Sequence, residues 1–189
     1  MADVKDAIEN SFRDLLKSRR YKSISVKDIC EEAHISRKTF YSVFRDKEDI
    51  VTYIFKRDVI GPLHQINSIF TLSEAGAMTG TIQQKIYKRI FDDGAFYRDL
   101  VSSMKGRDDT FIRVVTNSLY DFNMSVLKRT GHIVDETHAD YVAYYFSSSQ
   151  AMIMQKWIFD NYVIPVDEFA RLYTSISLEY WLKVGEEYI

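Results

Sequence analysis

The sequence predicts an all-α protein in which an N-terminal three-helix domain with a helix-turn-helix precedes a C-terminal helical domain. Two observations support this prediction. The 189 residues include only seven glycines and two prolines, so long stretches contain no helix breaker. Along most of these stretches apolar residues recur at intervals of three and four, as they do on the buried face of a helix. The length suits one medium-sized domain or two small ones with a substantial core.

The first helix is expected to run from a cap at Asp3 to about Arg19. Its apolar residues share one helical face. They are Val4, Ile8, Phe12, Leu15 and Leu16. This face supplies the third wall of a small three-helix core.

The second helix is expected to begin after Ser25, an N-cap residue with Asp28 as its capping-box partner. An apolar stripe follows at helical spacing. It consists of Val26, Ile29, Cys30 and Ala33. The periodicity stops at His34, where the chain must turn, and histidine tolerates the left-handed backbone region better than most residues.

A third helix is expected from Arg37 to Phe44, with Ser36 as its N-cap. It begins three residues after the preceding helix ends, which is the spacing of a helix-turn-helix. Its inward residues are Phe40, Val43 and Phe44, and its outward residues are Arg37, Lys38, Tyr41, Ser42 and Arg45. The outward face is basic and rich in hydrogen-bond donors, so this helix is the predicted reading helix for a DNA groove.

Asp46 is expected to cap a fourth helix, and Lys47 lies at the N-terminal end of that helix, where an ammonium group and the helix dipole can hold a phosphate. We expect this helix to end at Gly61-Pro62. The predicted domains are therefore 1–60 and 61–189.

The charge distribution fits a local DNA-binding surface. The formal net charge is −2, but residues 1–60 hold 13 basic against 11 acidic side chains, and residues 61–189 hold 12 against 16. Between Ser36 and Lys47 only Asp46 opposes four basic side chains. Positive charge is thus concentrated where phosphates would be met.

The pattern S-V-x-D-I-C-x-x-A-H-I-S-x-x-T-F-Y-x-x-F-x-x-K-x-x-I, which runs from Ser25 to Ile50, resembles the N-terminal signature of TetR-type transcriptional regulators. The family's most recognisable positions are occupied by Ala33, Ser36, Thr39, Tyr41, Phe44 and Lys47. The sequence departs from the family twice: His34 replaces the usual turn glycine, and Lys38 replaces a small residue.

The resemblance implies a homodimeric regulator of transcription, expected to be a repressor, that binds a double-stranded DNA operator and responds to a small-molecule effector of unknown identity in its C-terminal domain. Lys38, Thr39, Ser42 and Arg37 are the candidates for base edges. Candidates for phosphates are Ser25, Lys27, Tyr41, Arg45 and Lys47, and Ser36 completes the predicted DNA-binding set.

The C-terminal domain is expected to contain helices at 63–72, 81–91, 95–104, 108–129, 135–162 and 167–184, with a small-residue loop at 73–80. Apolar stripes on the last two helices could fill the monomer's core or form a dimer surface. The stripes are Val142, Tyr145, Phe146, Ser149, Met152 and Ile153, then Phe169, Leu172, Tyr173, Ile176 and Tyr180. The family resemblance favours the dimer, because TetR-type proteins usually pair through these two helices.

A second resemblance concerns the segment QAMIMQKWIFDNYVIPVDEFA, residues 150–170. It is similar to the corresponding segment in the branch that includes regulators of dihydroxyacetone kinase operons.

The C-terminal domain is also rich in aromatic residues, which could line an effector pocket or form ordinary core. The residues considered are Phe70, Phe91, Phe96, Tyr97, Phe111, Tyr120, Phe122, Met124, Tyr144 and Trp157. None is singled out as a ligand contact, so the effector-binding residues are not predicted.

No catalytic, metal or cofactor site is predicted. The sequence lacks G-x-S-x-G, G-x-x-x-x-G-K-[ST] and G-x-G-x-x-G, and His64, His132 and His138 fall on different predicted elements. Because no catalytic motif is found, we expect the protein not to be an enzyme. We expect it to be cytoplasmic, since the charge-free stretch from Tyr141 to Gln155 is too short to span a membrane. The alternative function is a helical interaction module that acts through a protein partner.

Overall fold

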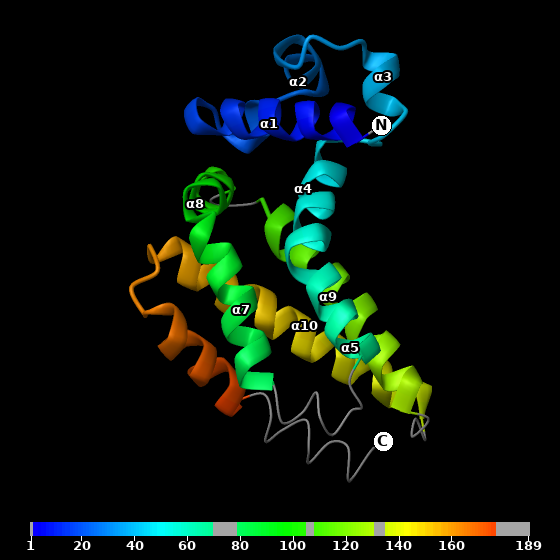
Figure 1. The fold of residues 1–189 in the computed structure, drawn as a ribbon, viewed down its shortest axis with the longest axis vertical. Helices are drawn as coiled ribbons and strands as arrows, with labels where there is room; N and C mark the ends of the chain where they lie inside the picture. Colours follow the sequence, from blue (N-terminus) through cyan, green and yellow to red (C-terminus); the bar gives the residue numbers. More distant parts are fainter. Residues whose placement is uncertain (1, 70–78, 105–107, 131–134, 177–189) are drawn as a thin grey trace.

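The computed structural model describes residues 2–69, 79–104, 108–130 and 135–176. Figure 1 shows a small head of three helices at one end and a longer helical body below it, joined by α4. The head contains α1 (Ala2–Ser18), the short 3₁₀ turn η1 (Tyr21–Ser23), α2 (Val26–Glu32) and α3 (Arg37–Tyr41). These elements and α4 (Lys47–Phe55) confirm the predicted helix-turn-helix domain.

The body contains further helices that pack side by side. They are α5 (Gly61–Ile69), α7 (Thr79–Asp92), α8 (Gly94–Ser103), α9 (Thr110–Thr130) and α10 (Glu136–Phe159), followed by helical residues 166–176. Every regular element in the described ranges is helical, so the all-α prediction is confirmed. Gly131, Phe70, Tyr180 and nearly all of the loop predicted at 73–80 lie outside those ranges.

The head is held together by apolar side chains that meet between its helices. Ile8 and Phe12 from α1, Ile29 from α2 and Phe40 from α3 are all 0% exposed. The Phe12 ring meets Tyr21 edge to face at 6.2 Å between ring centroids. The predicted three-helix core is thus the observed one.

Side-chain caps fix the helix starts of the head. Ser25 accepts a hydrogen bond from the Asp28 N–H at 3.2 Å, Ser36 accepts one from the Thr39 N–H at 3.0 Å, and Asp46 accepts one from the Asp49 N–H at 2.9 Å. All three N-caps match the prediction.

Two predicted helix limits in the head and one in the body are wrong. Helix α1 already includes Ala2, so Asp3 is not its cap. Helix α3 ends at Tyr41, before Phe44, although Phe44 still turns inward and is 3% exposed. The last described helix already includes residue 166, one residue before its predicted start at 167.

The predicted helix end at Gly61-Pro62 is also wrong. Helix α4 runs directly into a π-helical turn, η2 (Lys56–Ile60), and then into α5. Gly61 has helical dihedrals, φ −57° and ψ −53°, and its N–H donates to the Lys56 carbonyl five residues back. A proline has no N–H to donate and its ring crowds the carbonyl four residues earlier. The wider π turn lies where that crowding arises, so the helical path continues through Pro62.

Aromatic rings dominate the core of the body. Trp157 stacks on Phe169 with ring centroids 4.4 Å apart, and Tyr87 meets Phe169 edge to face at 4.8 Å. Tyr97 and Phe111 are 1% exposed. Of the aromatic residues considered for a pocket, Phe96, Tyr97, Phe111 and Trp157 are therefore ordinary core.

Candidate nucleic-acid interface

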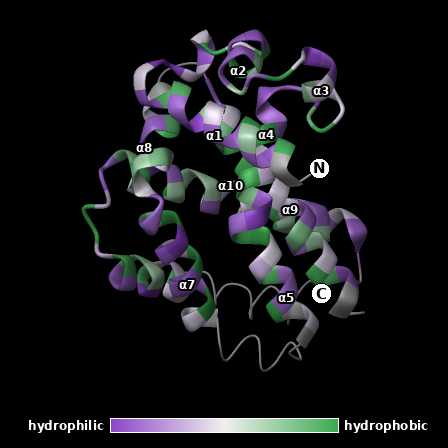
Figure 2. Cartoon of the chain, turned by 45° about the horizontal axis from the view of Figure 1, so that its top comes forward, coloured by the Kyte–Doolittle hydropathy of each residue, from purple (hydrophilic) through white to green (hydrophobic). Residues whose placement is uncertain are grey.

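Helix α3 presents a polar, basic face to solvent. Arg37, Lys38 and Ser42 are exposed, and Tyr41 is 57% exposed. The inward side chain Phe40 is fully buried, which fixes the orientation of the helix. In Figure 2 hydrophilic residues, in purple, alternate with hydrophobic ones along α2 and α3. This short helix can therefore offer hydrogen-bond donors to a partner without disturbing the core.

The turn between α2 and α3 has the predicted left-handed residue. His34 has φ 53°, and the His34 N–H donates to the Glu31 carbonyl at 3.2 Å. The Ile35 N–H donates to the Cys30 carbonyl at 3.0 Å. The two bonds close the end of α2 and direct the chain into α3.

Hydroxyl groups at the start of α3 bond mainly within the helix. The Ser36 and Thr39 hydroxyl oxygens lie 2.8 Å apart, and the Ser42 hydroxyl donates to the Thr39 carbonyl at 2.7 Å. Thr39 is half-buried. The strongest donors on the open face are consequently Arg37 and Lys38.

At the start of α2, Asp28 holds the backbone in place. Its carboxylate accepts from the Ser25 N–H at 2.7 Å and pairs with the Arg19 guanidinium at 3.0 Å. The hydrogen bonds from Arg19 and Ser25 hold the pKa of Asp28 well below its usual range. Lys27 is exposed and lies 3.5 Å from Glu31, so its ammonium remains open to solvent.

Arg45 follows α3 and is strongly exposed. Its side chain is 86% exposed and its guanidinium lies 3.1 Å from a carboxylate oxygen of Asp49. The hydrogen bond from Arg45 lowers the pKa of Asp49. Such an exposed pair contributes little to stability, so a phosphate could replace the carboxylate.

Lys47 lies differently from the other predicted phosphate ligands. It is half-buried, and its ammonium donates to the Tyr21 carbonyl at 2.6 Å and the Ile24 carbonyl at 2.8 Å. The ammonium also lies 4.1 Å from the centroid of the Tyr21 ring, and burial lowers its pKa. Lys47 therefore ties η1 to the start of α4. Sequence spacing could not show this role, because the two carbonyls lie more than 20 residues away along the chain.

The family model for bacterial regulatory proteins of the tetR family matches residues 13–54, which run from within α1 to the last turn of α4. This part of the chain is therefore similar to the helix-turn-helix domain of TetR-family transcriptional regulators. Its helix-turn-helix is the part that carries this match.

One relative is similar to this chain in sequence. The HTH-type dhaKLM operon transcriptional activator DhaS of Lactococcus lactis subsp. lactis (strain IL1403) is 43% identical over 51 residues. The match spans 27% of this chain and 27% of the relative. The similarity in sequence is thus confined to about a quarter of either protein.

Solved structures of TetR-type proteins share the whole fold. A putative TetR-family transcriptional regulator from Syntrophomonas wolfei str. Goettingen superposes with a TM-score of 0.66 at 16% identity, covering 100% of this chain and 97% of its own. A dihydroxyacetone kinase operon activator DhaS superposes with a TM-score of 0.54 at 20% sequence identity, and the match covers 97% of this chain and 98% of that one. The third structure is the TetR family repressor AlkX from Dietzia sp. Strain DQ12-45-1b, which is implicated in biodegradation of n-alkanes. It superposes with a TM-score of 0.55 at 18% sequence identity, and the match covers 98% of this chain and 99% of that one.

The apolar stripes predicted for a dimer are only partly exposed. On α10, Tyr145 is 59% and Met152 is 60% exposed; on residues 166–176, Ile176 is 60% exposed. Ser149 and Leu172 are exposed as well, and Val142 and Ile153 are half-buried. The prediction is wrong for Phe146, Phe169 and Tyr173, which are at most 9% exposed and fill the chain's own core.

The structure adds residues to the exposed face of α10 that the sequence stripe omitted. Tyr141 is 72% and Phe159 is 49% exposed. With Tyr145 and Met152 they follow one another at intervals of four, seven and seven residues, so all four share one helical face. We call Tyr141, Tyr145, Met152 and Phe159 the α10 face.

The described part of the chain has neither a metal cluster nor a membrane-spanning helix. It contains no group of three or more histidine, cysteine, aspartate or glutamate side chains that could hold a metal ion. No helix within it is long and apolar enough to cross a membrane.

Proposed function

We propose that this TetR-type chain is a homodimeric, sequence-specific DNA-binding regulator whose α3 enters the major groove. The observation that carries the proposal is the exposed set Arg37, Lys38 and Tyr41 on a helix whose inward residue, Phe40, is fully buried. We propose that residues 1–60 form the reading head and residues 61–189 form the dimerisation and effector-binding body. The proposed location of the protein is the cytoplasm, where operator DNA lies.

The proposed DNA contacts are assigned to base edges or to phosphates according to the hydrogen-bond donors of each side chain. Arg37 and Lys38 are assigned to base edges, with Ser42 and Thr39 beside them, because long cationic donors on a groove helix reach guanine acceptors. Assigned to phosphates are Ser25, Lys27, Tyr41 and Arg45. Ser36 acts as the cap of α3. Lys47 positions η1 and keeps one N–H donor for a phosphate.

The dimer is assigned to the α10 face together with Leu172 and Ile176. Large apolar side chains exposed in a row are typical of a surface that a second copy covers. A two-fold pairing sets the same face against itself and presents two copies of α3. The heads would then occupy half-sites about 34–36 Å apart on a near-palindromic operator.

A small-molecule effector bound in the body is proposed to control operator affinity. The unbroken helical path from Lys47 to Ile69 connects body and head, so an effector that prefers one body arrangement changes the spacing of the heads. Repression is the proposed direction, because a dimer spanning two major grooves blocks a promoter without further contacts. The relative DhaS is named an activator, and a promoter fused to a reporter gene distinguishes the two directions.

The test is to sequence the DNA that the purified full-length protein retains from sheared fragments of its own genome. We expect a few enriched sites with two-fold symmetry and half-sites one helical turn apart. Lys17→Gln, an exposed change on α1, is the control and should retain the same sites. The proposal is contradicted if the wild type retains the same DNA fragments as a double variant with Arg37→Ala and Lys38→Ala.

A further inference from the structure

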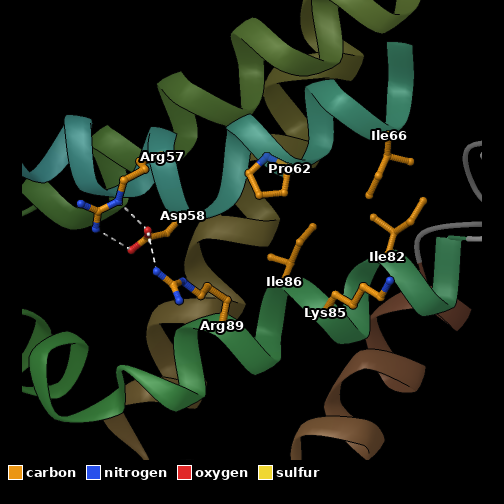
Figure 3. Close-up of a pocket in the computed structure, with 8 residues that line it drawn as sticks. All are labelled: Arg57, Asp58, Pro62, Ile66, Ile82, Lys85, Ile86 and Arg89. Atoms are coloured by element: carbon orange, nitrogen blue, oxygen red, sulfur yellow. Dashed lines mark hydrogen bonds and ion pairs between the residues drawn. The ribbon is translucent and has the colours of Figure 1, made fainter. Parts of the chain in front are cut away.

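A groove of about 390 Å³ lies between the η2–α5 segment and α7. Its apolar part is formed by Pro62, Ile66, Ile82 and Ile86, whose side chains point toward one another in Figure 3. The volume lies at the small end of ligand-binding pockets. The groove therefore has room for a short apolar chain.

Charged side chains gather at one end of this apolar surface. Asp58, from η2, has a side chain only 2% exposed, and both its oxygens accept hydrogen bonds from Arg57 at 2.8 and 3.3 Å. The same Arg57 donates to Glu9 of α1 at 2.6 and 3.0 Å. Arg57 is thus shared between two carboxylates and has little capacity left for a ligand.

Arg89 and Lys85 of α7 are differently placed. Arg89 is 60% exposed and reaches Asp58 through one contact at 3.4 Å. A guanidinium has five N–H donors, so most of its capacity faces the groove and solvent. Lys85, one helical turn earlier, lines the same groove, is exposed, and makes no ion pair with any residue the structure describes.

We propose that this groove binds a small organic anion with its charged head on Arg89, at the end of the groove beside Asp58, and its apolar chain against the isoleucines. An exposed guanidinium at the end of an apolar surface suits a carboxylate that carries a short alkyl chain, since the buried Asp58 already has Arg57 as its partner. The inference rests on the proposed function, because it names the site and chemical class of the effector.

Occupation of the groove changes the ion pairs that reach the head. An anion that takes Arg89 leaves Asp58 with Arg57 alone, and Arg57 is also a partner of Glu9 on α1. Glu9 in turn binds Arg13, which reaches Asp93 at 2.7 Å. The pairs form a continuous network from α7 to α1, so the anion alters the attachment of the head to the body.

The test measures calorimetric binding of acetate, butyrate and hexanoate to the full-length protein, with hexanol as the uncharged analogue. Affinity should rise about fourfold for each added methylene while the chain still finds apolar surface, and hexanol should bind at least tenfold more weakly than hexanoate. Arg89→Gln should weaken the binding of hexanoate about tenfold. Lys88→Gln, on the same helix but outside the groove and paired with Asp92 at 2.7 Å, is the matched control and should bind normally.

The site is contradicted if hexanoate fails to bind, or if the Arg89 and Lys88 variants bind it equally. A parallel gel shift with the retained DNA separates this inference from the proposed function. Hexanoate binding that depends on Arg89, in a protein that binds no DNA, supports the groove and overturns the proposed function. If the protein binds DNA and hexanoate binds through Arg89 without changing the affinity for DNA, the effector role of the groove is overturned.

Discussion

At the scale of single residues, His34 sets the turn that places the reading helix. Its φ of 53° lies in the left-handed region, where a Cβ atom costs about 1–2 kcal/mol. Glycine avoids this cost but gives up more freedom on folding. We expect His34→Gly to raise the free energy of unfolding by about 0.5–1 kcal/mol in urea denaturation. His34→Ala keeps the Cβ atom and should bring no such gain; an equal gain would show that the side chain, not the backbone, causes the strain.

The sequence predicted which side chains of the head are exposed better than it predicted which groups they contact. Arg37, Lys38 and Tyr41 face solvent as the helical spacing indicated, because that spacing depends only on neighbours along the chain. The position of Lys47 depends on the Tyr21 and Ile24 carbonyls, which approach it only after the head has folded. The DNA contacts themselves stay a prediction for every residue in the set.

At the scale of elements, the capping box of α2 has a measurable pH dependence. The pKa of Asp28 is lowered by its bonds with Arg19 and Ser25, so ionised Asp28 stabilises the folded state. This contribution is complete above the usual aspartate pKa of 3.8 and is lost as pH falls through the lower folded value. We expect the difference in unfolding free energy between the wild type and Asp28→Asn to be constant from pH 5 to 7, roughly the range where such carboxylates are ionised, and to shrink below about pH 4.

Urea denaturation at several pH values measures this difference. Asp14→Asn serves as the control, since Asp14 is 57% exposed and its ion pair is with the exposed Lys17. A difference for Asp28→Asn that does not change with pH would show that shape, and not charge, stabilises the start of α2.

Local sequence predicted the three capped helix starts of the head well and the helix end at Gly61-Pro62 badly. Ser25, Ser36 and Asp46 each cap a backbone N–H three residues ahead, so a short stretch of sequence contains both partners. Gly61-Pro62 also looks like a local signal, yet the π turn before it lets the helix continue. That turn packs against α5, α7 and α9, and such tertiary contacts cannot be found from the dipeptide alone.

At the scale of the whole molecule, the helical stripes of α10 indicated apolar faces but not which face was inside. Periodicity places Phe146 and Met152 on helical faces, while burial separates them: Phe146 is 5% exposed and Met152 is 60% exposed. The other helices of the body decide this separation. The all-α fold and the two-part organisation of the chain followed from sequence, whereas the charged groove beside η2 required distant residues to be brought together.

The proposed dimer makes a prediction at the same scale. Met152→Lys places a charge in the middle of the α10 face, where a second copy would have to bury it. We expect sedimentation velocity to show a shift from dimer toward monomer and gel shifts to show weaker operator binding in parallel. Lys128→Glu, a change at an exposed position of α9, should leave the protein a dimer in sedimentation velocity. A Met152→Lys protein that remains a dimer would place the interface elsewhere.

Helix α3 is proposed to read the base sequence, and the residues around it are proposed to bind phosphates. The most direct measurement titrates wild type, Lys38→Ala and Arg45→Ala on the retained operator and on a scrambled duplex at two salt concentrations. Lys38→Ala should weaken operator binding about 5- to 150-fold with little effect on the scrambled duplex. Arg45→Ala should weaken both duplexes alike and reduce the salt slope by about one. If the two variants weaken both duplexes to the same extent, or if the wild type prefers neither duplex, the account of α3 as a reading helix is wrong.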